Sequence, residues 1–214
     1  MPSQRLKWVT LGVLPMVAAC NLLTPLVFIS EQRQKVPPEF DKLGNRQTAV
    51  LVWTDAATLF DYPYARLELA AYVGGKLSAE LIQRGLDATI VDARDVDDYL
   101  QKNLTAVTDP RAVGKRFETD FVIFLQVLEF QIRDPREPQF LRGRITASVT
   151  VHDVKADPDQ SGEFELAPVT CEYPEGPPLL FSANNAPAVR EMLYRKFAEQ
   201  VARKFYEHTI DLGP

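Results

Sequence analysis

The sequence predicts an α/β domain: a mixed β-sheet with a βαβ unit, a β-hairpin and two long helices packed on it. Three observations lead to this fold class. An apolar strand is followed by a long amphipathic helix and a second strand. Two long strand patterns in the second half of the chain are separated by a turn, and a final amphipathic helix completes the pattern.

The first half of the predicted domain is the βαβ unit. Residues 48–53 form a continuous apolar run, which is typical of a strand buried on both faces. The next helix has Pro63 near its first turn and ends at Gly85, and residues 88–91 form the second strand. Gly74-Gly75 weakens this helix, and a close neighbour is one explanation. Its apolar face consists of Leu67, Ala70, Val73, Leu77 and Leu81.

The second half of the predicted domain holds the hairpin and the second long helix. Residues 121–128 are the strongest strand pattern in the chain, and residues 141–154 alternate as a strand with one solvated side. Residues 163–173 are expected to return as its hairpin partner. The last element is a helix over 187–208. Two short helices are also expected, at 95–103 and 110–117.

The composition is that of a globular protein with a negative balance. Hydrophobic residues make up 46% of the 214 residues and charged residues 25%. The net charge of −5 argues against nucleic acid as a partner, because phosphate binding needs a positive surface. The chain has two cysteines, Cys20 and Cys171, and we expect Cys171 to be a small packed side chain.

The amino-terminal segment has the layout of a secretory signal peptide. Arg5 and Lys7 precede an apolar stretch over 8–19. The last four residues, Val17-Ala18-Ala19-Cys20, resemble the bacterial lipobox. This resemblance implies a diacylglycerol on the Cys20 sulfur, cleavage before that residue, and a further acyl chain such as palmitate on the new amino group. Two or more acyl chains hold a protein stably on a membrane. Cleavage would remove Arg5 and Lys7 and change the net charge from −5 to −7.

Two other interpretations of this segment stay open. Cys20 can lie by chance beside an ordinary cleavage site, or residues 8–29 can remain as an uncut membrane anchor. Under the lipoprotein interpretation, residues 1–19 are a signal peptide, 20–45 a lipidated tether, and 46–214 a single domain. Asn21 follows the cysteine, and the sorting rule of Gram-negative bacteria then favours the outer membrane, facing the periplasm. The apolar patch Leu22–Ile29 can contact the membrane or the domain.

The sequence predicts no catalytic residue, no metal site and no cofactor. His152 and His208 lack the spacing of metal ligands. The acidic cluster over 92–98 is better explained as a solvated helix cap than as a cation site. Residues 157–162 imitate the start of a calcium loop, but the twelfth position is Pro168 rather than glutamate.

An aromatic patch precedes the first long helix. It consists of Phe60, Tyr62 and Tyr64, with Pro63 between the tyrosines. One interpretation is a loop that covers the core. The other is a partner-binding surface, because the loops at the carboxyl ends of parallel strands are where α/β sheets usually bind.

Three segments of the predicted domain form a familiar combination: the strand 49–52, the run Thr119-Asp120-Phe121-Val122-Ile123, and the strand ending Val149–Val154. Together they resemble the periplasmic domain of the curli-secretion lipoprotein family and the amino-terminal domain of the Tol-system β-propeller protein. The resemblance implies an α/β domain in the cell envelope that acts in export or assembly through protein contacts. The curli family needs extra long hairpins to build a pore. Here the segments 128–150 and 163–173 belong to the core sheet, so pore formation is not expected.

The leading hypothesis is a membrane-anchored envelope lipoprotein that is not an enzyme and binds another envelope protein within an export or assembly system. The alternatives are a hydrolase-type enzyme with an unrecognised site and a periplasmic carrier of an apolar ligand. An enzyme needs a pocket with convergent polar groups, and a carrier needs a large apolar cavity. A binding module presents an exposed apolar patch or an open strand edge. The sequence does not specify an oligomeric state.

Overall fold

The computed structural model describes residues 33–134, 136–157, 161–182 and 184–211, which belong to two units. The larger unit spans residues 37–207. In the other, β1 (Arg33–Val36) pairs antiparallel with β8 (His208–Asp211), and an exposed ion pair of 3.3 Å joins Arg33 to Asp211. The predicted last helix, 187–208, ends early: α6 (Ala186–Ala202) stops at Ala202, the short 3-10 helix η2 (Arg203–Phe205) follows, and β8 begins at His208.

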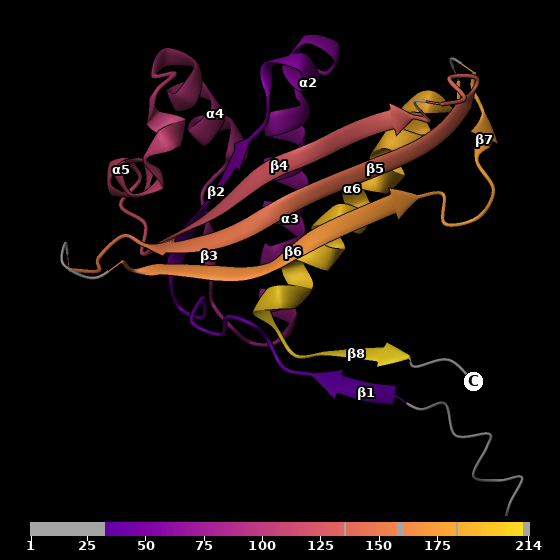
Figure 1. The fold of residues 1–214 in the computed structure, drawn as a ribbon. Helices are drawn as coiled ribbons and strands as arrows, with labels where there is room; N and C mark the ends of the chain where they lie inside the picture. The colour runs from indigo at the N-terminus through magenta and orange to yellow at the C-terminus, as the bar shows by residue number, and fades with distance from the viewer. Residues whose placement is uncertain (1–32, 135, 158–160, 183, 212–214) are drawn as a thin grey trace, which may run out of the picture. The chain divides into compact units, whose positions relative to one another are not determined.

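The larger unit is built on one mixed sheet, whose order is β3-β2-β4-β5-β6, with β7 added on β5 (Figure 1). β2 pairs in parallel with both β3 and β4, whereas β4, β5 and β6 pair antiparallel. The sequence prediction of a βαβ unit followed by a hairpin is confirmed. The strands are β2 (Gln47–Trp53), β3 (Thr89–Ile90), β4 (Phe121–Arg133), β5 (Phe140–Asp153), β6 (Glu163–Tyr173) and β7 (Leu179–Leu180).

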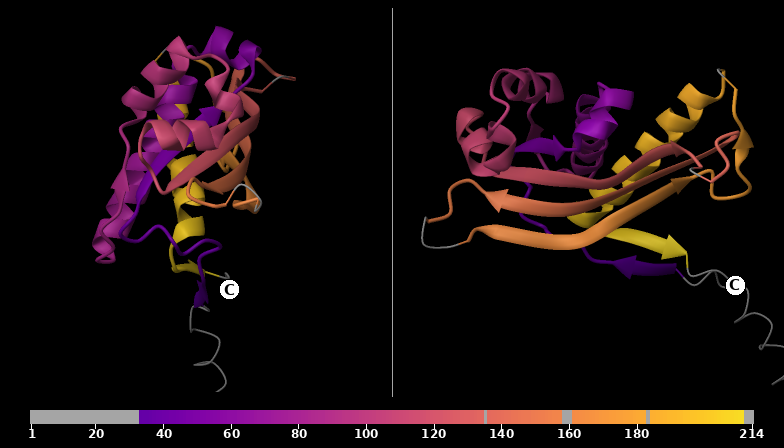
Figure 2. Two further views of the ribbon diagram at one scale, coloured as in Figure 1. Left: turned by 90° about the vertical axis from the view of Figure 1, so that its left-hand side faces the viewer. Right: turned by 45° about the horizontal axis from the view of Figure 1, so that its top comes forward.

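Helices cover both faces of this sheet, but unequally (Figures 1 and 2). The long helices α3 (Ala65–Gln83) and α6 (Ala186–Ala202) pack side by side on the inner face. The shorter helices α4 (Ala93–Lys102) and α5 (Pro110–Arg116) cover β2 and the first part of β4 on the outer face. The remaining helical segments are α2 (Ala56–Asp61), η1 (Ala106–Thr108) and η2 (Arg203–Phe205).

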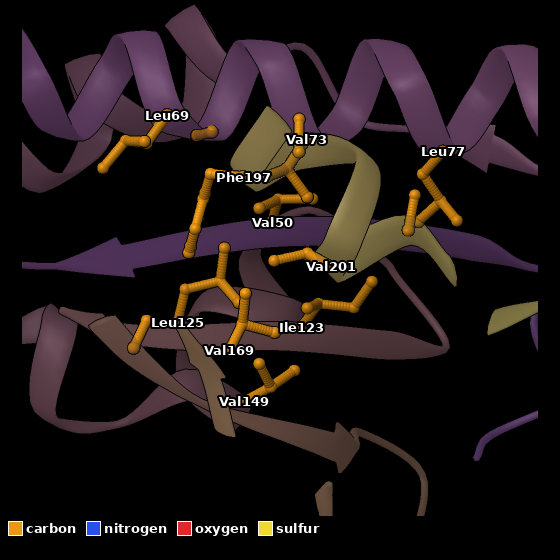
Figure 3. Packing of buried hydrophobic residues seen from close by; sticks show 14 of the residues in the cluster. Val50, Leu69, Val73, Leu77, Ile123, Leu125, Val149, Val169, Phe197 and Val201 are labelled. Carbon is orange, nitrogen blue, oxygen red and sulfur yellow. The ribbon is translucent and has the colours of Figure 1, made fainter. Parts of the chain in front are cut away.

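The main core lies between the sheet and the two long helices (Figure 3). Its buried residues are at most 7% exposed, and each buried valine or leucine contributes roughly 1.5–3 kcal/mol to folding. Both predicted long helices thus pack on the sheet as expected. The residues labelled in Figure 3 are Val50, Leu69, Val73, Leu77, Ile123, Leu125, Val149, Val169, Phe197 and Val201.

The alternation along β5 explains why the outer face stays open beyond the short helices. Leu141, Ile145 and Val149 point into the core and are at most 1% exposed. The residues between them, such as Arg144 and Thr146, stay partly exposed on the other side. A strand with this period-two pattern buries one face only, so the predicted solvated side of this strand is confirmed.

The larger unit begins at Pro37, earlier than the predicted start at Arg46. Phe40 and Leu43 are 4% and 1% exposed and belong to the core, although the sequence places them in the tether. Glu39 fastens this segment: its carboxylate pairs with Lys204 Nζ at 2.8 Å and accepts the Ala167 N–H at 2.8 Å. Residues 30–45 are mostly polar, so their composition did not indicate that these two side chains are buried.

Two glycines in helices provide a matched test of the packing. A Cβ on Gly75 would meet nothing within 4 Å, whereas a Cβ on Gly114 would lie 2.3 Å from Val154 Cγ2 and 2.8 Å from Val122 Cγ2. We therefore expect Gly75→Ala to raise the free energy of unfolding by about 0.5–1 kcal/mol. Gly114→Ala should lower it by about 1–3 kcal/mol, because α5 would be forced off the sheet.

Urea unfolding followed by circular dichroism measures both changes. Equal effects of the two substitutions would contradict this placement of α5.

Candidate binding surface

The proposed lipidation site, Cys20, and the apolar patch Leu22–Ile29 lie outside the described residues. Their roles therefore stay predictions. Among the residues that are described, no helix is long and apolar enough to cross a membrane.

The predicted aromatic patch lies at the carboxyl end of β2, where α2 and the start of α3 follow the strand. Asp55 caps α2, since its carboxylate accepts the Thr58 N–H at 2.7 Å. Phe60 and Tyr64 are 87% and 69% exposed, whereas Tyr62 is half-buried. The patch thus divides: Tyr62 covers the core, and Phe60 and Tyr64 face solvent. The core-covering interpretation therefore fits Tyr62, while partner binding through Phe60 and Tyr64 stays a prediction.

Tyr62 anchors this segment through a chain of aromatic rings. Its ring centroid lies 5.0 Å from that of Phe130, which lies 6.0 Å from Tyr194, which in turn lies 5.7 Å from Tyr72. Burial raises the pKa of both Tyr62 and Tyr194. Pairs of aromatic rings at such distances add about 0.5–1.5 kcal/mol beyond area burial. Phe60 and Tyr64 are therefore presented on a segment that is fixed to the sheet and to both long helices.

Exposed apolar side chains gather at the same end of the sheet. The parallel strands β2 and β4 finish there, and β7 and the first two turns of α6 adjoin the β4–β5 turn (Figure 1). Ten large hydrophobic side chains are exposed among the described residues, and seven lie at this end. They are Phe60, Tyr64, Leu128, Leu179, Leu180, Phe181 and Met192, which we call the apolar end. The other three are Ile82, Leu86 and Leu104.

Four arginines lie among these apolar side chains. Arg133 stacks on Phe181 with its guanidinium carbon 3.9 Å from the ring centroid, and Arg142 donates to the Gly176 carbonyl at 3.2 Å. With Arg136 and Arg190, they form no ion pair within the described part of the chain. Asp61 and Glu137 lie at the same end, so its charge is mixed. Arginine and aromatic residues are the types enriched in protein interfaces.

The outer face of the sheet carries a separate feature, a groove of about 360 Å³. Its floor is the outer side of β2, β4 and β5, its wall is η1 with the start of α5, and its rim is β6. Sequence patterns could not identify this groove because its residues come from six elements. They are Trp53, Val107, Thr108, Pro110, Phe124, Gln126, Thr150, His152, Glu163 and Glu165, which we call the outer groove.

His152 lines the outer groove and is 7% exposed. Its Nδ1 lies 3.5 Å from Glu163 Oε1, and its ring packs edge-on against Phe124. Its Nε2 has no hydrogen-bond partner among the described residues. Burial lowers the pKa of His152, more than the Glu163 carboxylate raises it. The imidazole is therefore neutral at neutral pH, and its Nε2 can accept a hydrogen bond.

The acidic cluster over 92–98 contains a helix cap and an ion pair. Asp92 caps α4, and Asp97 pairs with Arg66 of α3 at 2.8 Å while accepting from Gln101 at 2.7 Å. No group of three potential metal ligands occurs among the described residues. The calcium-like loop falls partly on residues 158–160, which are not described.

Cys171 is fully buried on β6, as predicted. Burial raises the pKa of its thiol to about 11. The side chain therefore contributes to packing and is protonated at neutral pH.

The division of the aromatic patch predicts opposite stability effects for neighbouring residues. Tyr62→Ala should lower the free energy of unfolding by about 2–3 kcal/mol, because it removes a ring packed on Phe130. Phe60→Ala should change it by less than about 0.5 kcal/mol, because that side chain is 87% exposed. Thermal unfolding of both variants beside the unsubstituted chain is the measurement. A large loss in the Phe60 variant would show that this side chain is packed in solution.

No protein-family model matches the sequence, and no curated protein matches it either. Solved structures resemble it at low identity. The PelC dodecamer from Paraburkholderia phytofirmans has 11% identity and a TM-score of 0.41, over 82% of this chain and 98% of that chain. Lipoprotein GNA1162 from Neisseria meningitidis has 12% identity and a TM-score of 0.40, over 73% and 98%. The hypothetical protein CT253 from Chlamydia trachomatis has 13% identity and a TM-score of 0.36, over 74% and 96%. The resemblance to the curli-secretion and Tol families is not confirmed by these matches and stays a prediction.

Proposed function

We propose that this chain is an envelope lipoprotein, anchored by lipid on Cys20, that binds another envelope protein through its apolar end. In this proposal it is not an enzyme, and it serves an export or envelope-assembly system. The proposed location is the outer membrane, facing the periplasm, as the residue after Cys20 favours.

The apolar end is the observation that carries the proposal. A monomer commonly exposes single hydrophobic side chains, but a concentration of them marks a contact site. Among the described residues, seven of the ten large hydrophobic side chains that are exposed share one end of the sheet. Phe60 and Leu180 are 87% and 67% exposed. The free energy that burial of these apolar side chains would supply is therefore not gained in the free protein. A protein partner that covers them recovers it.

The rigidity of this end supports the proposal further. The capping bond from Asp55 and the ring contact of Tyr62 hold the segment that bears Phe60. Binding then orders few additional groups, so less conformational entropy opposes association. The arginines beside the apolar side chains supply donors for carboxylates or carbonyls at the rim of an interface.

The anchor is tested by its covalent chemistry. We expect the mature protein from the membrane fraction to begin at Cys20 and to carry the mass of a diacylglycerol and an acyl chain. Cys20→Ser should prevent the modification, because serine lacks the thiol that is alkylated. Mass spectrometry of the amino-terminal peptide measures both. An intact peptide over Met1–Ala19 in the membrane-bound protein would overturn the lipid anchor.

The partner surface is tested by site-specific photo-crosslinking in cells. A photoreactive phenylalanine analogue at Phe60, Leu128 or Leu180 should yield adducts with another protein. The same analogue at Ile82 or Leu104, which are equally apolar and are 62% and 77% exposed, should yield none. These controls lie away from the apolar end. Adducts from the control positions alone, or only uncrosslinked chain from every position, would contradict the proposed surface.

A further inference from the structure

The outer groove contains two carboxylates that form no ion pair with a described lysine or arginine. Glu163 and Glu165 lie two residues apart on β6, so both side chains lie on the outer face. Neither forms an ion pair with a lysine or arginine in the described part of the chain, and Glu163 faces only the neutral His152. Asp109 and Arg111 approach His152 from the start of α5 with opposite charges. The rim of the groove therefore keeps a negative balance.

The floor of the groove is aromatic and apolar. Trp53 ends β2 opposite Gln126 of β4, and Phe124 lies two residues before Gln126 on β4; all three line the outer groove. Pro110 closes the side formed by α5. An aromatic face next to carboxylates attracts a cation through two interactions. One is with the quadrupole of the ring, and the other is with the negative charges of the carboxylates. It also accepts an apolar stem that an inorganic cation does not have.

An unsatisfied acceptor lies in the same groove. The His152 side chain is 9% exposed, its Nδ1 is directed to Glu163, and its Nε2 has no partner among the described residues. An unpaired polar atom at this depth costs free energy that a ligand N–H recovers. This observation is independent of the carboxylates and indicates a donor.

We propose that the outer groove binds an organic cation, an ammonium or guanidinium group carried on an apolar stem. The stem lies against Trp53 and Phe124, and the charge lies between Glu163 and Glu165. An N–H group of the ligand is donated to His152 Nε2. This inference does not depend on the proposed function, because it concerns a different face of the sheet.

The chain provides its own reporter for this binding. It contains two tryptophans, so Trp8→Phe leaves Trp53 as the single one. Full-length protein with that substitution, purified in detergent, is titrated with 2-phenylethylammonium while Trp53 emission is recorded. We expect a saturable change. The double variant Glu163→Gln/Glu165→Gln should weaken binding by about fivefold or more, because both attracting charges are lost.

Two controls separate charge from apolar contact. 2-Phenylethanol has the same stem without the charge, and it should give no saturable change over the same concentrations. Glu137→Gln removes an exposed carboxylate in the β4–β5 turn, outside the groove, and should leave binding unchanged. An unresponsive Trp53, equal binding of the alcohol, or unchanged affinity in a folded double variant would each overturn the proposal.

The source of the cation is decided by a second titration. A blocked Phe-Lys dipeptide is compared with phenylethylammonium, and a blocked Phe-norleucine dipeptide serves as its uncharged control. Tighter binding of the lysine peptide assigns the groove to a side chain of a partner protein. Tighter binding of the small amine assigns it to a free amine. Failure of both cations overturns the site, while crosslinking at Phe60 and Leu180 still tests the apolar end separately.

Discussion

The difference in length between β2 and β4 determines how the rest of the larger unit is arranged. β2 ends at Trp53, opposite Gln126, whereas β4 continues to Arg133. Up to Gln126, β4 has a parallel neighbour and helices on both faces. Beyond that point its only partner is β5, and a bulge after Val127 resets the alternation. The part of β4 that extends beyond the end of β2 supports the apolar end. The outer groove lies where the short helices no longer cover the outer face.

Charge is distributed unevenly over this framework. The net charge of −5 predicts a mildly acidic surface, yet the apolar end holds four arginines that form no ion pair with any described residue. The outer groove instead holds Glu163 and Glu165, which pair with no lysine or arginine in the same part of the chain. Elsewhere some charged side chains form ion pairs four residues apart on a helix, for example Lys76 with Glu80 and Arg195 with Glu191. Exposed pairs of this kind contribute little to stability, so they solvate the helices without marking a site.

The periodicity of apolar residues predicted the long elements well, because burial of one or two faces of an element sets the spacing of its apolar residues. The parallel strands, the hairpin and both long helices follow from such spacing. The short elements α2 and β7 are missed, since six and two residues are too few for a period. Phe40 and Leu43 escape notice for a related reason: isolated apolar residues in a polar stretch have no pattern, and their burial depends on Lys204 far along the chain.

The candidate sites were predictable only in part. Phe60 and Tyr64 follow a predicted strand, so their position at its carboxyl end could be expected. The run Leu179–Phe181, placed after two prolines, could have been noticed as apolar residues in a segment without a helical period. The outer groove could not, because Trp53, Phe124 and His152 belong to three strands that meet only after folding.

The fastening of Glu39 has a mechanical consequence for a protein held on a membrane. The chain enters the larger unit beside Lys204, where the Lys204 carbonyl accepts the N–H groups of Glu39 and Phe40 at 2.8 and 3.1 Å. If Cys20 bears the anchor that we propose, tension on the anchor reaches this point before it reaches β2. The load is then shared among an ion pair and hydrogen bonds that join Glu39 and Phe40 to Lys204 of η2 and to Ala167 of β6.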